Sequence, residues 1–289
     1  MKKIMMIGAH PDDCDICCGG LALKYVQLGY KVKFLSLDNG CGGHQTMQPE
    51  EIAARRRKEV QEVAKMAGIE YDVWDDSADC ELTASLEYRK RLVRDIRKFS
   101  PDLVITHRPN DYHVDHRNTS ILVQDASYLL IVPNFCPDVP AMEKMPVIMY
   151  FYDHFQNPPF EADVNVDIDD VIEQKYQLLN CHVSQFYEWL PYTEGSFHTV
   201  PEDPAERFEW LHCPRVPRDG KPLDESVLRI PWTNEVCECA EAVETVKYRD
   251  LLVKRYGEKG RNTLFSEAFA LCEYGTPLTE ETEKVFFPF

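Results

Sequence analysis

Histidines and carboxylates gather in two short segments of this 289-residue chain. The first, GAHPDD, spans residues 8–13 and carries His10, Asp12 and Asp13. The second, HRPNDYHVDH, spans residues 107–116 and holds three histidines and two aspartates. Adjacent residues in a turn point in different directions, so Asp12 and Asp13 can take separate roles. One carboxylate can bind a metal ion while the other accepts a proton from water.

Together, the two segments contain the parts of a metal-dependent hydrolytic site. A histidine, an aspartate and a second histidine suit a catalytic Zn²⁺ ion that keeps an open position for water. Zinc lowers the pKa of water from ~15.7 to about 7, a carboxylate removes the proton, and another histidine stabilises the oxyanion or protonates an amine. Taken singly, a His-Pro pair is typical of a turn and an Asp-Asp pair of a helix N-cap or loop. The presence of both segments in one chain favours a metal site.

The elements that must position these residues follow a regular order. Apolar periodicity predicts strands at 3–8, 31–37, 69–74 and 102–106, with helices at 16–28, 50–67 and 85–99 between them. This alternation predicts an α/β fold: a Rossmann-like, mostly parallel sheet with helices on both faces. Ligands of such sheets bind beyond the carboxyl ends of the strands. The two motifs follow the first and fourth strands and are expected there.

The second half of the chain is less regular. We expect strands at 147–152 and 164–168, helices at 169–189 and 236–256, and a C-terminal insertion or lid at 201–231. No linker or internal repeat divides the chain, so residues 1–289 are expected to form a single domain. In it, 1–120 would supply the catalytic half, and 121–289 would complete the sheet and select the substrate.

The charge balance excludes some classes of partner. Lysine and arginine number 32 against 49 aspartates and glutamates, a formal net charge of −17. Proteins that bind nucleic-acid backbones or anionic membranes carry basic surfaces instead. No apolar stretch approaches the roughly 18–20 residues of a membrane span. The short apolar run at the N-terminus is interrupted at His10, which favours a strand over a secretory signal.

Eleven cysteines are present. In the absence of a signal peptide, reduced thiols in a cytoplasmic protein are the favoured interpretation. Cys14-x-x-Cys17 has the spacing of a redox pair or of half a zinc site, but no second CxxC accompanies it. Small side chains that pack the start of a helix are the preferred explanation.

The two motifs resemble those of the LmbE/PIG-L family of zinc-dependent N-deacetylases, which act on N-acetylglucosaminyl compounds. That family shows a (G/A)HPDD motif after its first strand and an HPDH-type motif after a later one. Further segments are similar to family patterns: DNGCGG after the second strand, VDI at 166–168, His182-x-Ser184-Gln185, and SEAF at 266–269. The chain departs from the family at Cys14 and Asp15, where a glutamate is frequent, and at Val114, which replaces the proline of HPDH.

The resemblance implies roles for six residues. The implied zinc ligands are His10, Asp13 and His116. Asp12 is implied as the general base. His113 is implied as the electrophilic or acid partner, with Asp115 orienting it. Which of Asp12 and His113 protonates the departing amine is left open.

Other residues are expected near the substrate. The expected contacts are Arg56, His44, Asp111, Tyr112 and His182. For Arg56 the alternative is a solvated position in the basic run 55–58, for His44 an exposed loop position, and for His182 a packed core position. His107 is expected to be structural rather than a fourth ligand. Trp189, Trp210 and Trp232 could stack on sugar rings, although core packing is the default for tryptophan.

These observations lead to one preferred function. We expect a zinc-dependent hydrolase that removes the N-acetyl group of a small amino-sugar substrate, releasing acetate and a free amine. The alternatives are a non-catalytic metal- or sugar-binding module on the same fold and an amidohydrolase of another small N-acyl amine. A nucleotide-cofactor enzyme is disfavoured because no GxGxxG follows the first strand. Whether the chain forms a homo-oligomer is left open.

Overall fold

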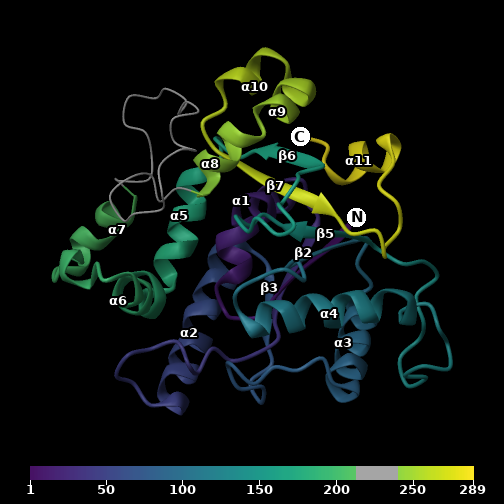
Figure 1. The fold of residues 1–289 in the computed structure, drawn as a ribbon, viewed down its shortest axis with the longest axis horizontal. Helices are drawn as coiled ribbons and strands as arrows, with labels where there is room; N and C mark the ends of the chain where they lie inside the picture. Colours follow the sequence, from purple (N-terminus) through teal and green to yellow (C-terminus); the bar gives the residue numbers. More distant parts are fainter. Residues whose placement is uncertain (213–239) are drawn as a thin grey trace.

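The computed structural model describes residues 1–212 and 240–289, and in these ranges seven strands form one sheet (Figure 1). The strands are β1 (Lys3–Gly8), β2 (Lys31–Ser36), β3 (Glu70–Val73), β4 (Leu103–Thr106), β5 (Val147–Phe151), β6 (Val164–Asp167) and β7 (Ser266–Leu271). Their order across the sheet is β3-β2-β1-β4-β5-β7-β6. The pairs from β3 to β5 are parallel, whereas β7 is antiparallel to both of its neighbours.

The expected α/β fold with a mostly parallel sheet is therefore confirmed. The unbroken apolar sequences of β1 and β4 are typical of parallel strands that are covered on both faces. Strand β7 was not predicted. Its sequence, SEAFAL, places Glu267 inside the strand, and a charged residue there hides the apolar pattern. Glu267 is nevertheless fully buried.

Helices connect and cover the strands. In chain order they are α1 (Asp13–Gln27), α2 (Pro49–Ala67), α3 (Leu86–Phe99), α4 (Val114–Leu129), α5 (Ile172–Cys181), α6 (Leu190–Glu194), α7 (Pro204–His212), α8 (Ala240–Lys247), α9 (Arg249–Tyr256), α10 (Glu258–Asn262) and α11 (Glu280–Phe286). The described ranges also contain a π-helical turn, Gln185–Trp189, and a 3₁₀ turn, Phe197–Thr199. Helix α2 begins at a proline and ends at Gly68 with φ +70°, two ordinary helix boundaries.

Three helix predictions need correction. The helix predicted at 16–28 begins earlier, at Asp13, inside the first motif. The helix predicted at 169–189 is two pieces, because the backbone leaves helical geometry at His182. In place of one helix at 236–256 there are α8 and α9, and residues 236–239 lie outside the described ranges. Of the insertion predicted at 201–231, only the part up to α7 is described.

Two apolar layers sandwich the sheet. On β1, Ile4 and Met6 pack with α1 and α5, whereas Met5 and Ile7 pack with α3 and α4 on the opposite face. Side chains alternate along a strand, so one strand serves both layers. Figure 1 shows α3 and α4 side by side. None of the described helices combines the length and apolar character that crossing a bilayer requires. The eight cysteines in the described ranges are all free.

The topology brings the two motifs together. From β1 the chain passes to β2 and β3 on one side, and then to β4 on the other side of β1. Strands β1 and β4 are parallel neighbours, with Ile7 opposite Thr106, so the segments that follow them leave the sheet at the same edge. A reversal of strand order is the usual ligand-binding position of an open α/β sheet.

Candidate metal centre and active site

The first motif folds around the carboxylate of Asp13. Its Oδ2 accepts hydrogen bonds from the backbone amides of Ala9 at 2.8 Å and His10 at 2.7 Å. Gly8 is required by close packing, because a Cβ atom there would lie 2.7 Å from Cβ of Asp13. This tight turn holds His10 and Asp13 on the same side, at the N-terminus of α1.

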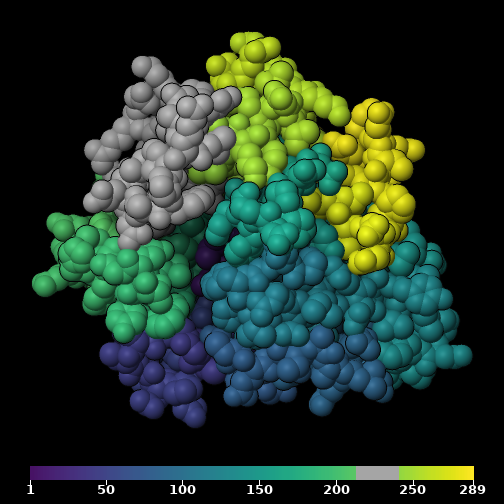
Figure 2. Space-filling model, in the orientation of Figure 1, coloured from purple at the N-terminus to yellow at the C-terminus, as the bar shows by residue number. Residues whose placement is uncertain are grey.

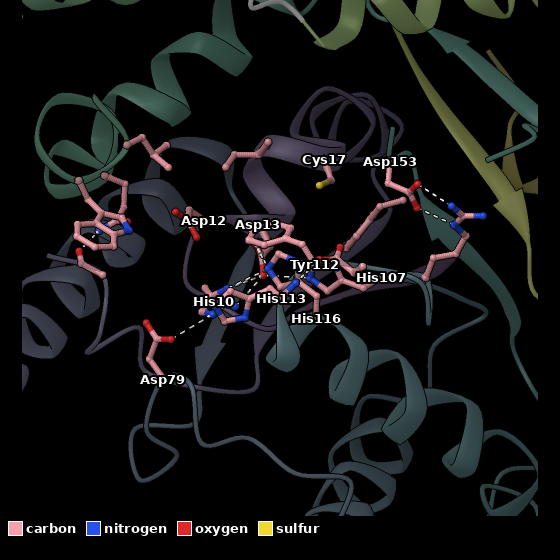
Figure 3. A pocket seen from close by; sticks show the side chains of 18 of the residues that line it. His10, Asp12, Asp13, Cys17, Asp79, His107, Tyr112, His113, His116 and Asp153 are labelled. Atoms are coloured by element: carbon pink, nitrogen blue, oxygen red, sulfur yellow. Dashed lines mark hydrogen bonds and ion pairs between the residues drawn. The ribbon is translucent and has the colours of Figure 1, made fainter. Parts of the chain in front are cut away.

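Three side chains converge from the two motifs (Figure 3). Nδ1 of His10 lies 3.1 Å from Nε2 of His116 and 3.5 Å from Oδ2 of Asp13. Nε2 of His116 lies 3.3 Å from Oδ1 of Asp13. Tetrahedral coordination with bonds of 2.0–2.2 Å places its ligand atoms about 3.4 Å apart. The two contacts of Asp13 use different carboxylate oxygens, and the expected trio has the N, N, O donor set of a catalytic zinc site.

Other combinations of donors are also close. Histidines and carboxylates in the described ranges form overlapping groups within 4.8 Å: His10–His113–His116, His10–Asp79–His113–Asp115 and Asp13–His107–His116. The trio implied by the family resemblance, His10, Asp13 and His116, overlaps these groups, and its side chains approach one another within 3.5 Å, with Oδ2 of Asp13 toward His10 and Oδ1 toward His116. His107 contacts Oδ2 of Asp13 at 3.0 Å and stacks on His116, with ring centroids 4.1 Å apart. His107 therefore contacts two of the expected ligands.

Each proposed histidine ligand is held through its second nitrogen. Nδ1 of His116 lies 3.0 Å from Oδ1 of Asp111. Nε2 of His10 faces Asp79 at 3.4 Å, with Asp38 and Asp115 slightly farther, at 3.7 Å. Such outer carboxylates fix the tautomer and ring orientation of a ligating histidine. Asp79 was not singled out from the sequence, since it belongs to an acidic loop with no motif.

The electrostatics of the cluster favour positive charge. Burial by itself would lower the pKa of both histidines. For His10 the carboxylates of Asp38 and Asp13 outweigh burial and raise the pKa well above its ordinary value. For His116, Asp13 and Asp111 raise the pKa to about 9. The negative potential that strengthens proton binding at these nitrogens also favours a divalent cation.

Asp12 has a partner that the sequence did not suggest. Oδ1 of Asp12 lies 2.8 Å from Nη2 of Arg56, whose guanidinium also donates to the carbonyls of Gly40 and Pro11. Arg56 is only 2% exposed, so it is not the solvated member of a basic run. It lines the cavity beside Asp12 and fixes the direction of this carboxylate.

His113 is held by the start of α4. It is the N-cap of the helix, and its Nδ1 accepts the backbone N–H of Asp115 at 3.2 Å. This acceptor role leaves the proton of the neutral ring on Nε2. Burial, followed by the nearby charges of His10 and His116, lowers the pKa of His113 below its ordinary value.

Asp115, expected to orient His113, makes its hydrogen bond to that residue through the backbone. Its Oδ2 instead accepts the backbone N–H of Cys80 at 2.6 Å, and the side chain is fully buried. The hydrogen bond that reaches His113 comes from the Asp115 backbone. The carboxylate therefore ties the start of α4 to the loop after β3.

A cavity of about 370 Å³ opens beside these residues. Figure 2 shows its position: the purple N-terminal segment lies at the bottom of a cleft between the teal and green parts of the surface. Of the five expected substrate contacts, Arg56, Asp111 and Tyr112 line the cavity. Tyr112 stands at the mouth, 75% exposed.

His44 and His182 do not line the cavity. Nε2 of His44 is bound by Glu188 at 2.7 Å, and its Nδ1 accepts the backbone N–H of Thr46 and of Met47. His182 is fully buried and lies 3.1 Å from Asp15. Both histidines therefore have structural partners and no path to a substrate in this structure.

The π-helical turn supplies part of the opposite wall. It is anchored by Ser184, whose N–H and hydroxyl both donate to Glu59, and by Gln185, whose amide donates to the carbonyl of Gly43. The turn places Gln185 and Trp189 in the cavity lining. π-Helical turns are frequent at functional sites. Trp210 instead packs against Tyr187, and Trp232 lies outside the described residues.

Comparison with known proteins agrees with this geometry. The family model described as GlcNAc-PI de-N-acetylase, PIG-L, matches residues 5–127, which include both motifs. The diacetylchitobiose deacetylase of Thermococcus kodakarensis is 33% identical over 206 residues, 66% of this chain and 75% of that protein. The chain belongs to the PIG-L family. The resemblance expected from the motifs is thus confirmed, and with it the enzyme class of N-deacetylases.

Two further comparisons extend the likeness. The probable N-acetyl-alpha-D-glucosaminyl L-malate deacetylase 2 of Bacillus anthracis is 23% identical over 222 residues, 73% of this chain and 92% of that protein. The solved structure of N,N'-diacetylchitobiose deacetylase from Pyrococcus horikoshii has a TM-score of 0.63 and 26% identity. That match covers 94% of this chain and 84% of the other.

Proposed function

We propose that this protein is a zinc-dependent deacetylase that hydrolyses the acetamide of an amino sugar to acetate and a free amine. The observation that carries the proposal is the convergence of His10, Asp13 and His116 within 3.5 Å, with Asp12 and His113 beside them in one cavity. Two nitrogen donors and one carboxylate suit Zn²⁺.

Zinc at these three residues would supply Lewis-acid chemistry, lowering the pKa of water and polarising the acetamide carbonyl. Asp12 acts as the general base and takes a proton from the attacking water. Arg56 holds this carboxylate in place through the 2.8 Å ion pair. Because Arg56 is buried, it keeps Asp12 directed at the cavity rather than free to rotate.

His113 stabilises the developing oxyanion. Its Nδ1 accepts a backbone N–H, so the neutral ring presents its Nε2–H as a donor. A positioned donor of this kind is worth about 10²–10³ in kcat in related acyl-transfer sites. Asp12, which has gained the proton from water, delivers it to the departing amine. The Asp12 carboxylate thus takes the proton when water attacks and gives it up when the amine departs.

The cavity favours an uncharged remainder of the substrate. Both arginines that line it already face carboxylates: Arg56 pairs with Asp12, and Arg108 makes two contacts of 2.7 Å with Asp153. Among the described residues, no arginine or lysine in the lining is left for a carboxylate or phosphate. Aromatic side chains suited to sugar rings line it as well, namely Tyr112, Phe155 and Trp189.

A neutral carbohydrate such as N,N'-diacetylchitobiose therefore fits this cavity better than an N-acetylglucosaminyl malate. The test is acetate release from these two compounds and from N-acetylglucosamine, with the bound metal measured by elemental analysis. We expect one zinc per chain, the highest kcat/KM for the disaccharide, loss of activity on chelation and recovery with Zn²⁺. A chain with no metal and no acetate release would instead be a binding module. A preference for the malate conjugate would refute the assignment of a neutral substrate.

A further inference from the structure

A buried ion pair lies against helix α1 and has no place in the proposed reaction. Lys175 of α5 and Glu267 of β7 are 1% and 0% exposed, with Nζ and Oε1 2.8 Å apart. Glu241 of α8 contacts the same Nζ at 2.5 Å. A buried ion pair is weak evidence for stability, because removing two charges from water is costly. Its position therefore calls for an explanation other than stability.

The pair sits on a break in α1. At Cys18 the backbone leaves helical geometry, with φ −154° and ψ 22°. The helix thus consists of a first turn, Asp13–Cys17, and a longer second part. The first turn carries Asp13, and two other residues of it, Ile16 and Cys17, line the cavity. The angle between the two parts of α1 therefore sets the direction of a metal ligand.

The ion pair is inserted into the hydrogen-bond ladder at this break. In a continuous helix the amide of Gly20 would donate to the carbonyl of Ile16, four residues earlier. Here the Gly20 amide donates to Oε1 of Glu267 at 2.9 Å, and the Ile16 carbonyl accepts from Nζ of Lys175 at 2.7 Å. Insertion of side chains into the ladder is a recognised cause of helix kinks.

Glu267 also caps the second part of the helix. Its Oε2 accepts the amide of Leu21 at 2.7 Å, so one carboxylate serves two consecutive helix amides. Packing leaves little slack, because a Cβ atom on Gly20 would lie 3.0 Å from Oε1 of Glu267 and 2.9 Å from Ile168. The Glu267 carboxylate, the Lys175 ammonium and the two parts of α1 are thus connected by hydrogen bonds.

We propose that Lys175 and Glu267 are positioning residues for catalysis, which hold the Asp13–Cys17 turn at the angle that directs Asp13 to the metal and Asp12 to the substrate. The inference rests on the proposed function, since it takes Asp13 as a metal ligand. Glu267 supplies the acceptor for two amides of α1, the helix that begins within GAHPDD.

The test is the double variant Lys175→Met/Glu267→Gln. It removes one charge of each sign, and because it also takes the Lys175 contact away from the buried Glu241, the deciding readouts are the zinc Kd and kcat rather than Tm. The matched control is Asp170→Asn, which removes the ion pair of Lys24 with Asp170 (2.7 Å) in the second part of the same helix. We expect the zinc Kd of the double variant to rise about tenfold and its kcat at saturating zinc to fall about tenfold. KM and all values of the control should stay within about twofold.

A double variant with unchanged zinc Kd and kcat, and only a lower Tm, would overturn the proposal and make the pair a scaffold. If the double variant fails to fold, Gly20→Ala replaces it, since this change crowds Glu267 without removing a charge. Gly20→Ala should also raise the zinc Kd, and an unaltered Kd would count against the positioning role of Glu267. Wild-type zinc content and acetate release are measured in parallel. A wild type that binds no zinc refutes the proposed function itself, whereas zinc binding unaffected by the variants refutes only this inference.

Discussion

Arg56 and Asp12 form an ion pair of 2.8 Å in which both side chains are less than one tenth exposed. The arginine belongs to α2 and the aspartate precedes α1, so two helices meet at the proposed general base. Opposite charge at this distance, away from water, fixes the carboxylate more firmly than a surface pair would. Through this pair, the packing of α2 sets the orientation of the carboxylate in the proposed proton transfer.

Replacing Arg56 should therefore reduce catalysis and stability together. Arg56→Lys keeps the charge but cannot reach Asp12 and the carbonyls of Gly40 and Pro11 at once. We expect kcat to fall about 10²-fold with normal zinc content. Arg56→Ala should cost about 3–5 kcal/mol of unfolding free energy, because it leaves a buried carboxylate unpaired. Arg57→Lys, at a partly exposed neighbour that pairs with Asp75, is the control and should change neither quantity.

Asp12→Asn tests the general base directly. The amide has the size of the carboxylate but cannot accept the proton of water. We expect kcat to fall by about 10²–10⁴ while zinc stoichiometry and folding are retained. Turnover is followed by acetate release and the metal by elemental analysis. Near-normal turnover in this variant would assign the base to another residue.

Asp111→Asn should act on the metal rather than on the chemistry. Oδ1 of Asp111 lies 3.0 Å from Nδ1 of His116 and also accepts the backbone N–H of His113. Loss of the negative charge should weaken zinc binding about 10–100-fold, and excess zinc should restore most of the activity. Competition with a chelator measures the affinity. Asp125→Asn on α4, which breaks a partly exposed pair with Arg89 of α3, is the matched control. Equal zinc affinity in both variants would disprove the role of Asp111.

Trp189→Ala should affect substrate binding. The indole lines the cavity from the π-helical turn, and aromatic rings of this kind suit contact with sugar rings. We expect KM for the disaccharide to rise about tenfold with kcat within threefold, since aromatic contacts of this kind are worth roughly 1–1.5 kcal/mol. Trp210→Ala removes an indole that packs on Tyr187 outside the cavity lining. It should leave KM unchanged, and a similar KM increase in both variants would indicate a general loosening instead.

Much of the proposed site could be predicted because it comes from two contiguous segments. His10, Asp12 and Asp13 lie within one tight turn, and His113 and His116 lie on one turn at the start of α4. Strand periodicity placed both turns at the same edge of the sheet, and the structure has them there. Short spacing and local periodicity are properties that a sequence displays directly.

The substrate contacts were harder to predict. His44 and His182 were expected near the substrate, with an exposed loop position and a packed core position as their alternatives, and in the structure they contact Glu188 and Asp15. Asp79 and Phe155, which do line the cavity, come from loops without a recognisable pattern. Loop direction depends on contacts made after folding, so residue type alone does not tell which side chains face the substrate.

By itself, the sequence determined the alternating elements, the parallel sheet and the residues that can do chemistry, because these follow from local periodicity and spacing. Only the tertiary structure decided their partners. Arg56 on Asp12, Asp111 beside His116, and Glu267 in the break of α1 are contacts between elements that the topology brings together. Glu267 shows the reason most clearly. In sequence it is a charge that interrupts a strand, and only the packing of β7 against α1 makes it the missing partner of a helix amide.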